Sequence, residues 1–256
     1  PQTQVTVVGI PQWARNNPPA EEVQGPTRFR PSQEAETKPD GNAGNDNKPS
    51  TPSPLDKPRD DYAIRLGHAV HSLLEFLPEI PVADRGTAMT AFLARPEYEL
   101  KPADQKYTAR NITRLLADAN FASVFGPDAK PEVSVTGRLW QDGKPVALSG
   151  QVDRLVIDGD TVTIVDYKNG WKVPEKAEDA GARYIAQMAA YRLALQQVYP
   201  DKKIRCALLW TRKAQLMEMP DALMDQAVKA MRLRAVDPAS VPAPAARKVS
   251  GPKPKR

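Results

Sequence analysis

Cysteine is nearly absent from this sequence, with Cys206 as the single example among 256 residues. One thiol excludes an internal disulfide, a cysteine-ligated zinc site and a cysteine-ligated iron–sulfur cluster. Histidine is also scarce, with two residues. No apolar run approaches the ~18 residues that a membrane span needs, and no signal peptide is recognisable. We therefore expect a cytoplasmic protein that has no iron–sulfur cluster and no membrane partner.

Proline is in excess, but it is concentrated at the two ends of the chain. Of the 26 prolines, 11 lie in residues 1–60 and five in residues 237–256. The formal net charge of +5 equals the five basic residues among the last eleven positions, and the rest of the chain is balanced. This excludes a uniformly basic nucleic-acid binder, although a local basic stripe stays possible. We predict a disordered Pro-rich linker at 1–58, one folded domain at 59–236 and a disordered basic tail at 237–256.

Apolar residues at helical spacing follow the predicted linker. They occur at i, i+4, i+7, i+8 and i+11 and predict one buried helix face: Leu66, Val70, Leu73, Leu74 and Leu77. Pro78 and Pro81 end this helix. Further helices are predicted at 82–94, 104–119, 183–199 and 221–234.

From Glu132 onward the hydrophobic period changes to two, which is typical of strands. Turns at Asp142-Gly143 and Asp158-Gly159 separate three of them. These strands are predicted at 132–140, 146–157 and 161–167, and a fourth at 204–210. Helices followed by a β-meander, a helix, a strand and a helix predict an α/β or α+β sheet with helical flanks.

The hairpin of the second and third predicted strands carries two carboxylates on one face. A turn at Asp158-Gly159 sets Asp166 diagonal to Asp153, and a turn at Gly159-Asp160 sets them directly opposite. Like charges so placed repel, so a cation is expected beside them. Lys168, on the same face, is one candidate, and a divalent metal is the other. A partly exposed hairpin with surface acids and one ion pair explains the pattern equally well.

Both histidines lie on the first predicted helix. His71 falls at the edge of the buried face, where it could reach a site, and His68 faces solvent. A histidine in such a place is more often a packed polar residue than a ligand. Gly67 costs about 1 kcal/mol relative to Ala inside a helix, which suggests close approach of another backbone or of a ligand.

One face of the predicted helix 183–199 carries Tyr184, Gln187 and Tyr191, spaced i, i+3 and i+7. Amphipathic packing accounts for such a face. The alternative is that Gln187 and Tyr191 offer hydrogen bonds to a phosphodiester or orient Lys168.

Taken together, four short motifs are more specific than any one of them. In order and spacing they resemble the RecB-like branch of the PD-(D/E)XK nucleases. The resemblance implies a restriction-endonuclease-like α/β core, with a central mixed β-sheet flanked by helices and an N-terminal helical segment. The motifs are Gly67-x-x-x-His71-x-x-Leu74-Glu75, Gly150-x-x-Asp153-Arg154-Leu155, Val165-Asp166-Tyr167-Lys168 and Gln187-x-x-x-Tyr191.

The resemblance extends to residues 186–195, 198–200 and 205–212, which look like the C-terminal end of the AddA subunits of bacterial AddAB helicase–nucleases. Those proteins process DNA double-strand ends for recombinational repair. Because the sequence does not begin with Met and holds no Gly-x-x-x-x-Gly-Lys-Ser/Thr phosphate loop, we expect a C-terminal piece without the ATPase motor. The partners implied are a DNA end, an AddB-type subunit and the helicase body of the parent chain, in a bacterial cytoplasm.

The resemblance also implies residue roles. His71, Asp153, Asp166 and the main-chain carbonyl of Tyr167 would bind Mg²⁺, and Lys168 would be the catalytic lysine. Mn²⁺ should be accepted too, because a nitrogen ligand is softer than Mg²⁺ prefers. The residues expected to bind DNA or support the site are Gln187, Tyr191 and Arg154. Asn169 departs from the family, which often has Thr after the lysine. The competing hypothesis is a non-catalytic nuclease-like module that guides DNA or contacts a subunit.

Overall fold

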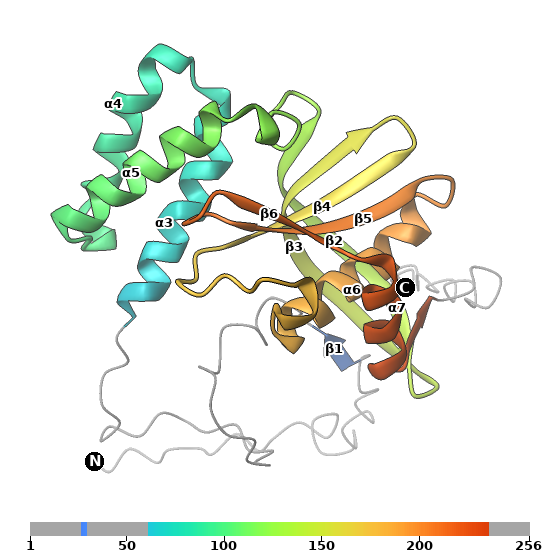
Figure 1. Cartoon of the computed structure of the whole chain (residues 1–256). Coiled ribbons are helices and arrows are strands. Elements are labelled where there is room, and N and C mark those ends of the chain that lie inside the picture. The colour runs from blue at the N-terminus through green and yellow to red at the C-terminus, as the bar shows by residue number, and fades with distance from the viewer. Residues whose placement is uncertain (1–26, 30–60, 236–256) are drawn as a thin grey trace, which may run out of the picture.

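The structure is a computed structural model that describes residues 27–29 and 61–235 (Figure 1). The predicted linker at 1–58, apart from residues 27–29, and the predicted basic tail at 237–256 lie outside the described residues.

Three helices precede the strands of the meander and lie together beside the sheet (Figure 1). They are α3 (Tyr62–Phe76), α4 (Val82–Leu93) and α5 (Pro102–Ala117). The predicted apolar stripe of the first helix is buried, and a short 3-10 turn that contains Pro78 follows it. None of the described helices is both long enough and apolar enough to cross a membrane.

The sheet has seven strands within the described residues. The meander is β2 (Ala129–Gln141), β3 (Lys144–Asp158) and β4 (Thr161–Lys168), and its strands pair antiparallel. After α6 (Ala182–Val198), β5 (Lys203–Trp210) pairs parallel with β4. The order β6-β5-β4-β3-β2-β7 confirms the predicted mixed sheet flanked by helices.

Three short strands were not predicted. β6 (Gln215–Met219) forms a hairpin with β5, and β1 (Thr27–Phe29) pairs parallel with β3 inside the segment predicted to be linker. The predicted last helix, 221–234, was too long. Helix α7 (Asp221–Ala230) ends early, Arg232 takes a left-handed φ of 54°, and β7 (Leu233–Ala235) then pairs with β2.

Strand β4 is buried on both faces because the protein has a core on each side of the sheet. Val162 and Ile164 face the core that α6 and α7 cover. Val165 and Tyr167, at the alternate positions, face the core built with α3, α4 and α5. The end of β4, where Asp166 and Lys168 lie, is therefore held between two packed layers.

A tight contact joins β3 to α6. Tyr191 is fully buried, and its ring passes so close to Gly150 that a Cβ on residue 150 would lie 2.2 Å from the tyrosine hydroxyl oxygen. This contact links two of the four sequence motifs, since the glycine of one makes room for the tyrosine of the other.

We predict that Gly150→Ala lowers the free energy of unfolding by about 1–3 kcal/mol, because the added methyl overpacks this contact. Gly86→Ala is the matched control, since a Cβ there, inside α4, meets nothing within 4 Å. That change should raise stability by about 1 kcal/mol through helix propensity. Urea unfolding of both variants checks the pair, and equal effects would contradict the packing argument.

Candidate active site

The turn between β3 and β4 determines how two carboxylates meet. It is Gly159-Asp160, not Asp158-Gly159. Of the two registers that the sequence allowed, this is the one that sets Asp153 directly opposite Asp166, one position beyond the last pair of the ladder.

The turn between β2 and β3 adds a third carboxylate. Asp142 and Gly143 have φ values of 51° and 77°, as a two-residue type I′ turn requires. The register of this hairpin puts Glu132 of β2 opposite Asp153. Glu132, Asp153 and Asp166 thus form a row across three neighbouring strands, which we call the acidic row. The turn was predicted from the sequence, but Glu132 was not. Counting residue pairs outward from the turn at Asp142-Gly143 would have set Glu132 opposite Asp153.

Asp153, in the middle of the row, binds groups from a helix and a strand. Its Oδ1 lies 3.3 Å from Nδ1 of His71 on α3, and its Oδ2 accepts a 2.5 Å hydrogen bond from the Tyr167 main-chain N–H. Burial disfavours charge on both side chains, but their mutual attraction outweighs it. The pKa of Asp153 is therefore lowered and the pKa of His71 is raised.

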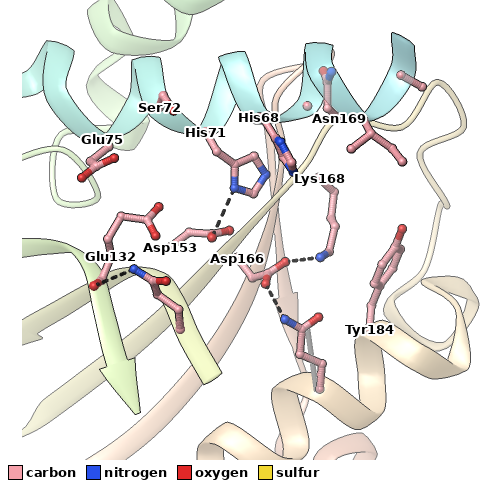
Figure 2. Close-up of a pocket in the computed structure, with 15 residues that line it drawn as sticks. His68, His71, Ser72, Glu75, Glu132, Asp153, Asp166, Lys168, Asn169 and Tyr184 are labelled. Atoms are coloured by element: carbon pink, nitrogen blue, oxygen red, sulfur yellow. Dashed lines mark hydrogen bonds and ion pairs between the residues drawn. The ribbon is translucent and has the colours of Figure 1, made fainter. Parts of the chain in front are cut away.

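Asp166, at one end of the row, is paired with Lys168 and Gln187. Lys168 Nζ forms an ion pair with Oδ2 (Figure 2). Gln187 Nε2 donates a 3.0 Å hydrogen bond to Oδ1. Lys168 also lies over the Tyr184 ring, with Nζ 4.2 Å from the ring centroid. Burial opposes charge on Lys168, but the adjoining Asp166 carboxylate outweighs it and raises the lysine pKa. Lys168 is therefore held as a cation.

Glu132, at the other end, forms no ion pair among the described residues. Burial, followed by the charges of Asp153 and Glu75, raises the pKa of Glu132 to about 7, and the smaller lowering effects of His71 and Arg154 do not offset this. Its backbone is left-handed, with a φ of 49°, which is uncommon for a residue other than glycine. Negative charge on Glu132 is therefore disfavoured in the metal-free site.

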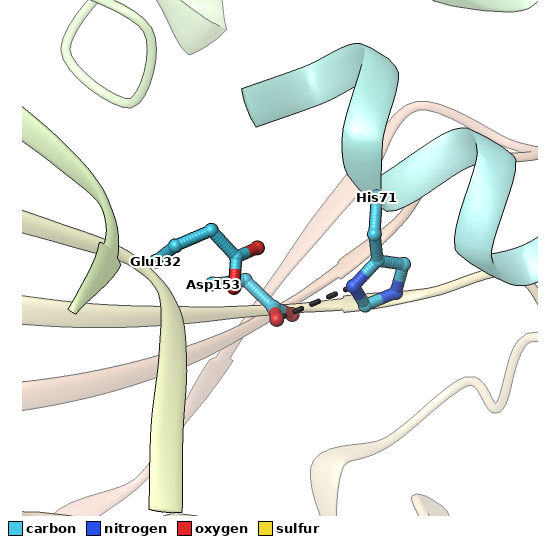
Figure 3. A group of neighbouring side chains, drawn as sticks. All are labelled: His71, Glu132 and Asp153. Atoms are coloured by element: carbon cyan, nitrogen blue, oxygen red, sulfur yellow. Dashed lines mark ion pairs between the residues drawn. The ribbon is translucent and has the colours of Figure 1, made fainter. Parts of the chain in front are cut away.

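His71, Glu132 and Asp153 fit a divalent cation. Each offers one ligand atom, and these atoms all lie within 4.8 Å of one another (Figure 3). Two carboxylates and an imidazole suit Mn²⁺ and, less well, Mg²⁺. The predicted ligand Asp166 lies next to this group but outside it. Ligation by the Tyr167 carbonyl stays a prediction.

The acidic row, His71 and Lys168 line one cleft of about 600 Å³. Its walls come from α3, α6, the first residues of β2, the middle of β3 and the end of β4. Gly67 lines its wall, and a Cβ there would meet nothing within 4 Å. Within the described residues no other backbone comes that close to Gly67, and approach of a ligand stays a prediction. His68, exposed as expected, stands at the same wall.

A sequence profile of the PD-(D/E)XK nuclease superfamily matches residues 48–246 of the chain. The chain belongs to this superfamily. No curated protein matches it. A solved structure described as "Crystal structure of SSO0001" is similar at 11% identity and a TM-score of 0.29, over 66% of this chain and 83% of that chain. The family thus confirms the nuclease fold and implies metal-dependent phosphodiester hydrolysis.

Two residues that were predicted to bind DNA or support the site lie in the interior of this PD-(D/E)XK nuclease. Arg154 is fully buried, and it donates hydrogen bonds to the Tyr167 hydroxyl at 3.1 Å and to the Leu74 carbonyl. Tyr191 is equally buried. Neither side chain is exposed, so of the two predicted roles, support from the interior is the one that their positions favour, and DNA binding stays a prediction. Gln187, which is 4% exposed, supports Asp166.

We predict that Mn²⁺ stabilises the chain, by about 2.7 kcal/mol at 100 times its Kd. At pH 8, above the Glu132 pKa of about 7, Glu132→Gln should raise the melting temperature of the metal-free chain and reduce the shift that Mn²⁺ causes. The first effect follows from relieved repulsion and the second from a lost ligand. Thermal melts with and without Mn²⁺ measure both.

Asp158→Asn is the matched control, since Asp158 is an exposed carboxylate on the β3–β4 hairpin that lies outside the cleft and outside the group of three ligands. It should keep the full Mn²⁺ shift. An undiminished shift in Glu132→Gln would exclude Glu132 as a ligand.

Proposed function

We propose that this chain is the nuclease domain of an AddA-type helicase–nuclease, and that it degrades DNA exonucleolytically at double-strand ends for recombinational repair. The observation that carries the nuclease part is the acidic row in an open cleft, with His71 at one side and Lys168 at the other. Such a site places negative ligands, a cation and space for a phosphodiester within one pocket.

A divalent cation held by His71, Glu132 and Asp153, beside Asp166, would activate water and neutralise charge on the phosphate. The side chains of the chain itself do the rest. Lys168 is held in place by Asp166 and Tyr184, and it offers its N–H groups to a phosphate oxygen on which charge develops. Because the ion pair keeps Lys168 protonated, we assign it charge neutralisation and orientation of water rather than proton abstraction. Gln187 fixes the Asp166 carboxylate for that pairing.

The AddA-type assignment is supported by the motifs in residues 186–195, 198–200 and 205–212. An AddB-type subunit and the helicase body of the parent chain are the partners that this assignment proposes. Its direct test is the reading frame upstream of Pro1. We expect it to encode a Gly-x-x-x-x-Gly-Lys-Ser/Thr phosphate loop, and a frame without one would overturn the helicase assignment while leaving the nuclease proposal intact.

We predict that Asp166→Asn and Lys168→Ala each slow Mg²⁺-dependent digestion of end-labelled single-stranded DNA by about 10²–10⁴-fold. Each change removes a charge that the transition state needs. Asp158→Ala is the matched control, because Asp158 is an exposed carboxylate on the same hairpin, and it should cleave at the wild-type rate.

Circular dichroism melts show whether each variant is folded. A folded Asp166→Asn chain that cleaves at the wild-type rate would refute the site. A wild-type chain that binds DNA in Mg²⁺ without cleaving it would favour the non-catalytic module.

A further inference from the structure

An exposed tryptophan follows the catalytic lysine by three residues. Trp171 is 71% exposed, in a protein whose described large apolar side chains are otherwise mostly buried. It lines a second cavity, of about 1,120 Å³. Tyr184, whose ring lies under Lys168, lines both this cavity and the active-site cleft. The two spaces therefore adjoin at Tyr184, and the tryptophan lies along the continuation of the site.

The Trp171 ring is held by a cation and a second aromatic ring. The Arg212 guanidinium carbon lies 3.7 Å from its ring centroid, and the Tyr107 ring stacks near it at 6.1 Å and 30°. Arg212 is in turn anchored, since its Nε donates a 2.8 Å hydrogen bond to the Asn169 carbonyl. The Trp171 ring is therefore exposed although its position is fixed by contacts with Arg212 and Tyr107.

Thr211, the residue before Arg212, is hydrogen-bonded to the backbone of the catalytic lysine. The main-chain N–H of Thr211 donates a 3.0 Å hydrogen bond to the Lys168 carbonyl, and the Thr211 hydroxyl bonds the Asn169 side chain at 3.1 Å. Gly170 keeps the segment close to β5, because a Cβ there would touch the Trp210 ring at 3.4 Å. Three residues span at most ~10 Å, so the ring is within reach of a nucleotide adjoining the one that Lys168 contacts.

The charges around the tryptophan favour a polyanion. Lys172, Arg183 and Lys213 line the second cavity together with Glu175 and Asp179, and Arg212 adds a further cation on the ring itself. An aromatic face beside backbone-tracking cations is the arrangement by which proteins hold single-stranded nucleic acid. Duplex DNA keeps its bases stacked on one another, so an unpaired base is the group that can use this ring.

We propose that Trp171, braced by Arg212, is a base-stacking platform for the single-stranded DNA segment next to the scissile phosphate. The inference rests on DNA being the substrate and adds a subsite to it. It also makes the site selective, because a strand whose bases are unpaired gains a contact that a duplex cannot make.

The test compares Trp171→Ala, Trp171→Phe and the control Val82→Ala, which removes a 77% exposed apolar side chain from α4. Binding of a fluorescent oligo-dT strand is measured by anisotropy in EDTA, so that no cleavage occurs. Loss of one stack should weaken binding about 5- to 150-fold in Trp171→Ala. Trp171→Phe should recover most of it, Val82→Ala should match the wild type, and a blunt duplex of equal length should not distinguish the variants.

A second arm uses oligonucleotides with one base replaced by an abasic spacer, moved position by position. One spacer position should weaken binding to the wild type and have no effect on Trp171→Ala. In Mg²⁺, Trp171→Ala should raise KM more than it lowers kcat. This arm compares the wild-type chain with Trp171→Ala alone. Because Trp171 is exposed, the variant should fold, and thermal melts confirm that it does.

The outcomes separate this inference from the nuclease proposal. One outcome is that cleavage depends on Asp166 while Trp171→Ala keeps the wild-type affinity and KM. That result would overturn the platform alone, and the exposed ring would then be assigned to a contact with another protein. Trp171-dependent binding without cleavage would support the platform and refute the nuclease. A wild-type chain that does not bind single-stranded DNA would overturn the platform directly.

Discussion

The acidic row of Glu132, Asp153 and Asp166 is held together by backbone register and not by any attraction among its members. Adjacent strands lie ~4.8 Å apart, and two unit charges ~5 Å apart at an effective dielectric of 20 repel by about 3 kcal/mol. His71 outweighs this for Asp153, whose pKa is lowered. Lys168 pairs with Asp166, but burial still raises the pKa of that carboxyl. Glu132 forms no ion pair among the described residues, and its pKa is raised to about 7. The fold therefore maintains a deficit of positive charge at one end of the row, which a bound cation would correct.

Holding that row requires the helix layer and the sheet to keep their relative positions. Arg154 provides one link, because it joins the Leu74 carbonyl, one turn of α3 beyond His71, to the hydroxyl of Tyr167 on β4. Tyr167 in turn gives its N–H to Asp153. A guanidinium taken out of water is expensive. Nη1 has no hydrogen-bond partner among the described residues, so the interior holds this side chain by the two hydrogen bonds of Nε and Nη2. A shift of α3 that moved His71 from Asp153 would also strain them, and the ligands from helix and sheet are thus coupled through the interior.

Strong local signals in the sequence predicted most of the fold. The helical stripe from Leu66 to Leu77 and the period-two strands were sufficient for α3 and the meander. The sequence put Asp153 and Asp166 on one face of the sheet, but it left two registers open, and the turn is Gly159-Asp160 rather than Asp158-Gly159. The short strands β1, β6 and β7 were missed because three to five residues carry no measurable period. The burial of Arg154 was missed for another reason: a charged side chain is placed inside by the partners that the tertiary fold supplies, Leu74 from a helix 80 positions away, and no local pattern encodes them.

The charge of the whole chain says little about how this protein handles a polyanion, and the placement of charge says much more. A DNA strand would meet repulsion at the acidic row and attraction at Lys168 and Arg212, with only Tyr184 and the short segment 169–171 between these regions. With a phosphate at Lys168, the bases next to it would be attracted toward Trp171 and not toward the acidic row. A bound metal would make the repulsive end attractive to the scissile phosphate, so the same cation would serve both the chemistry and the placement of that phosphate.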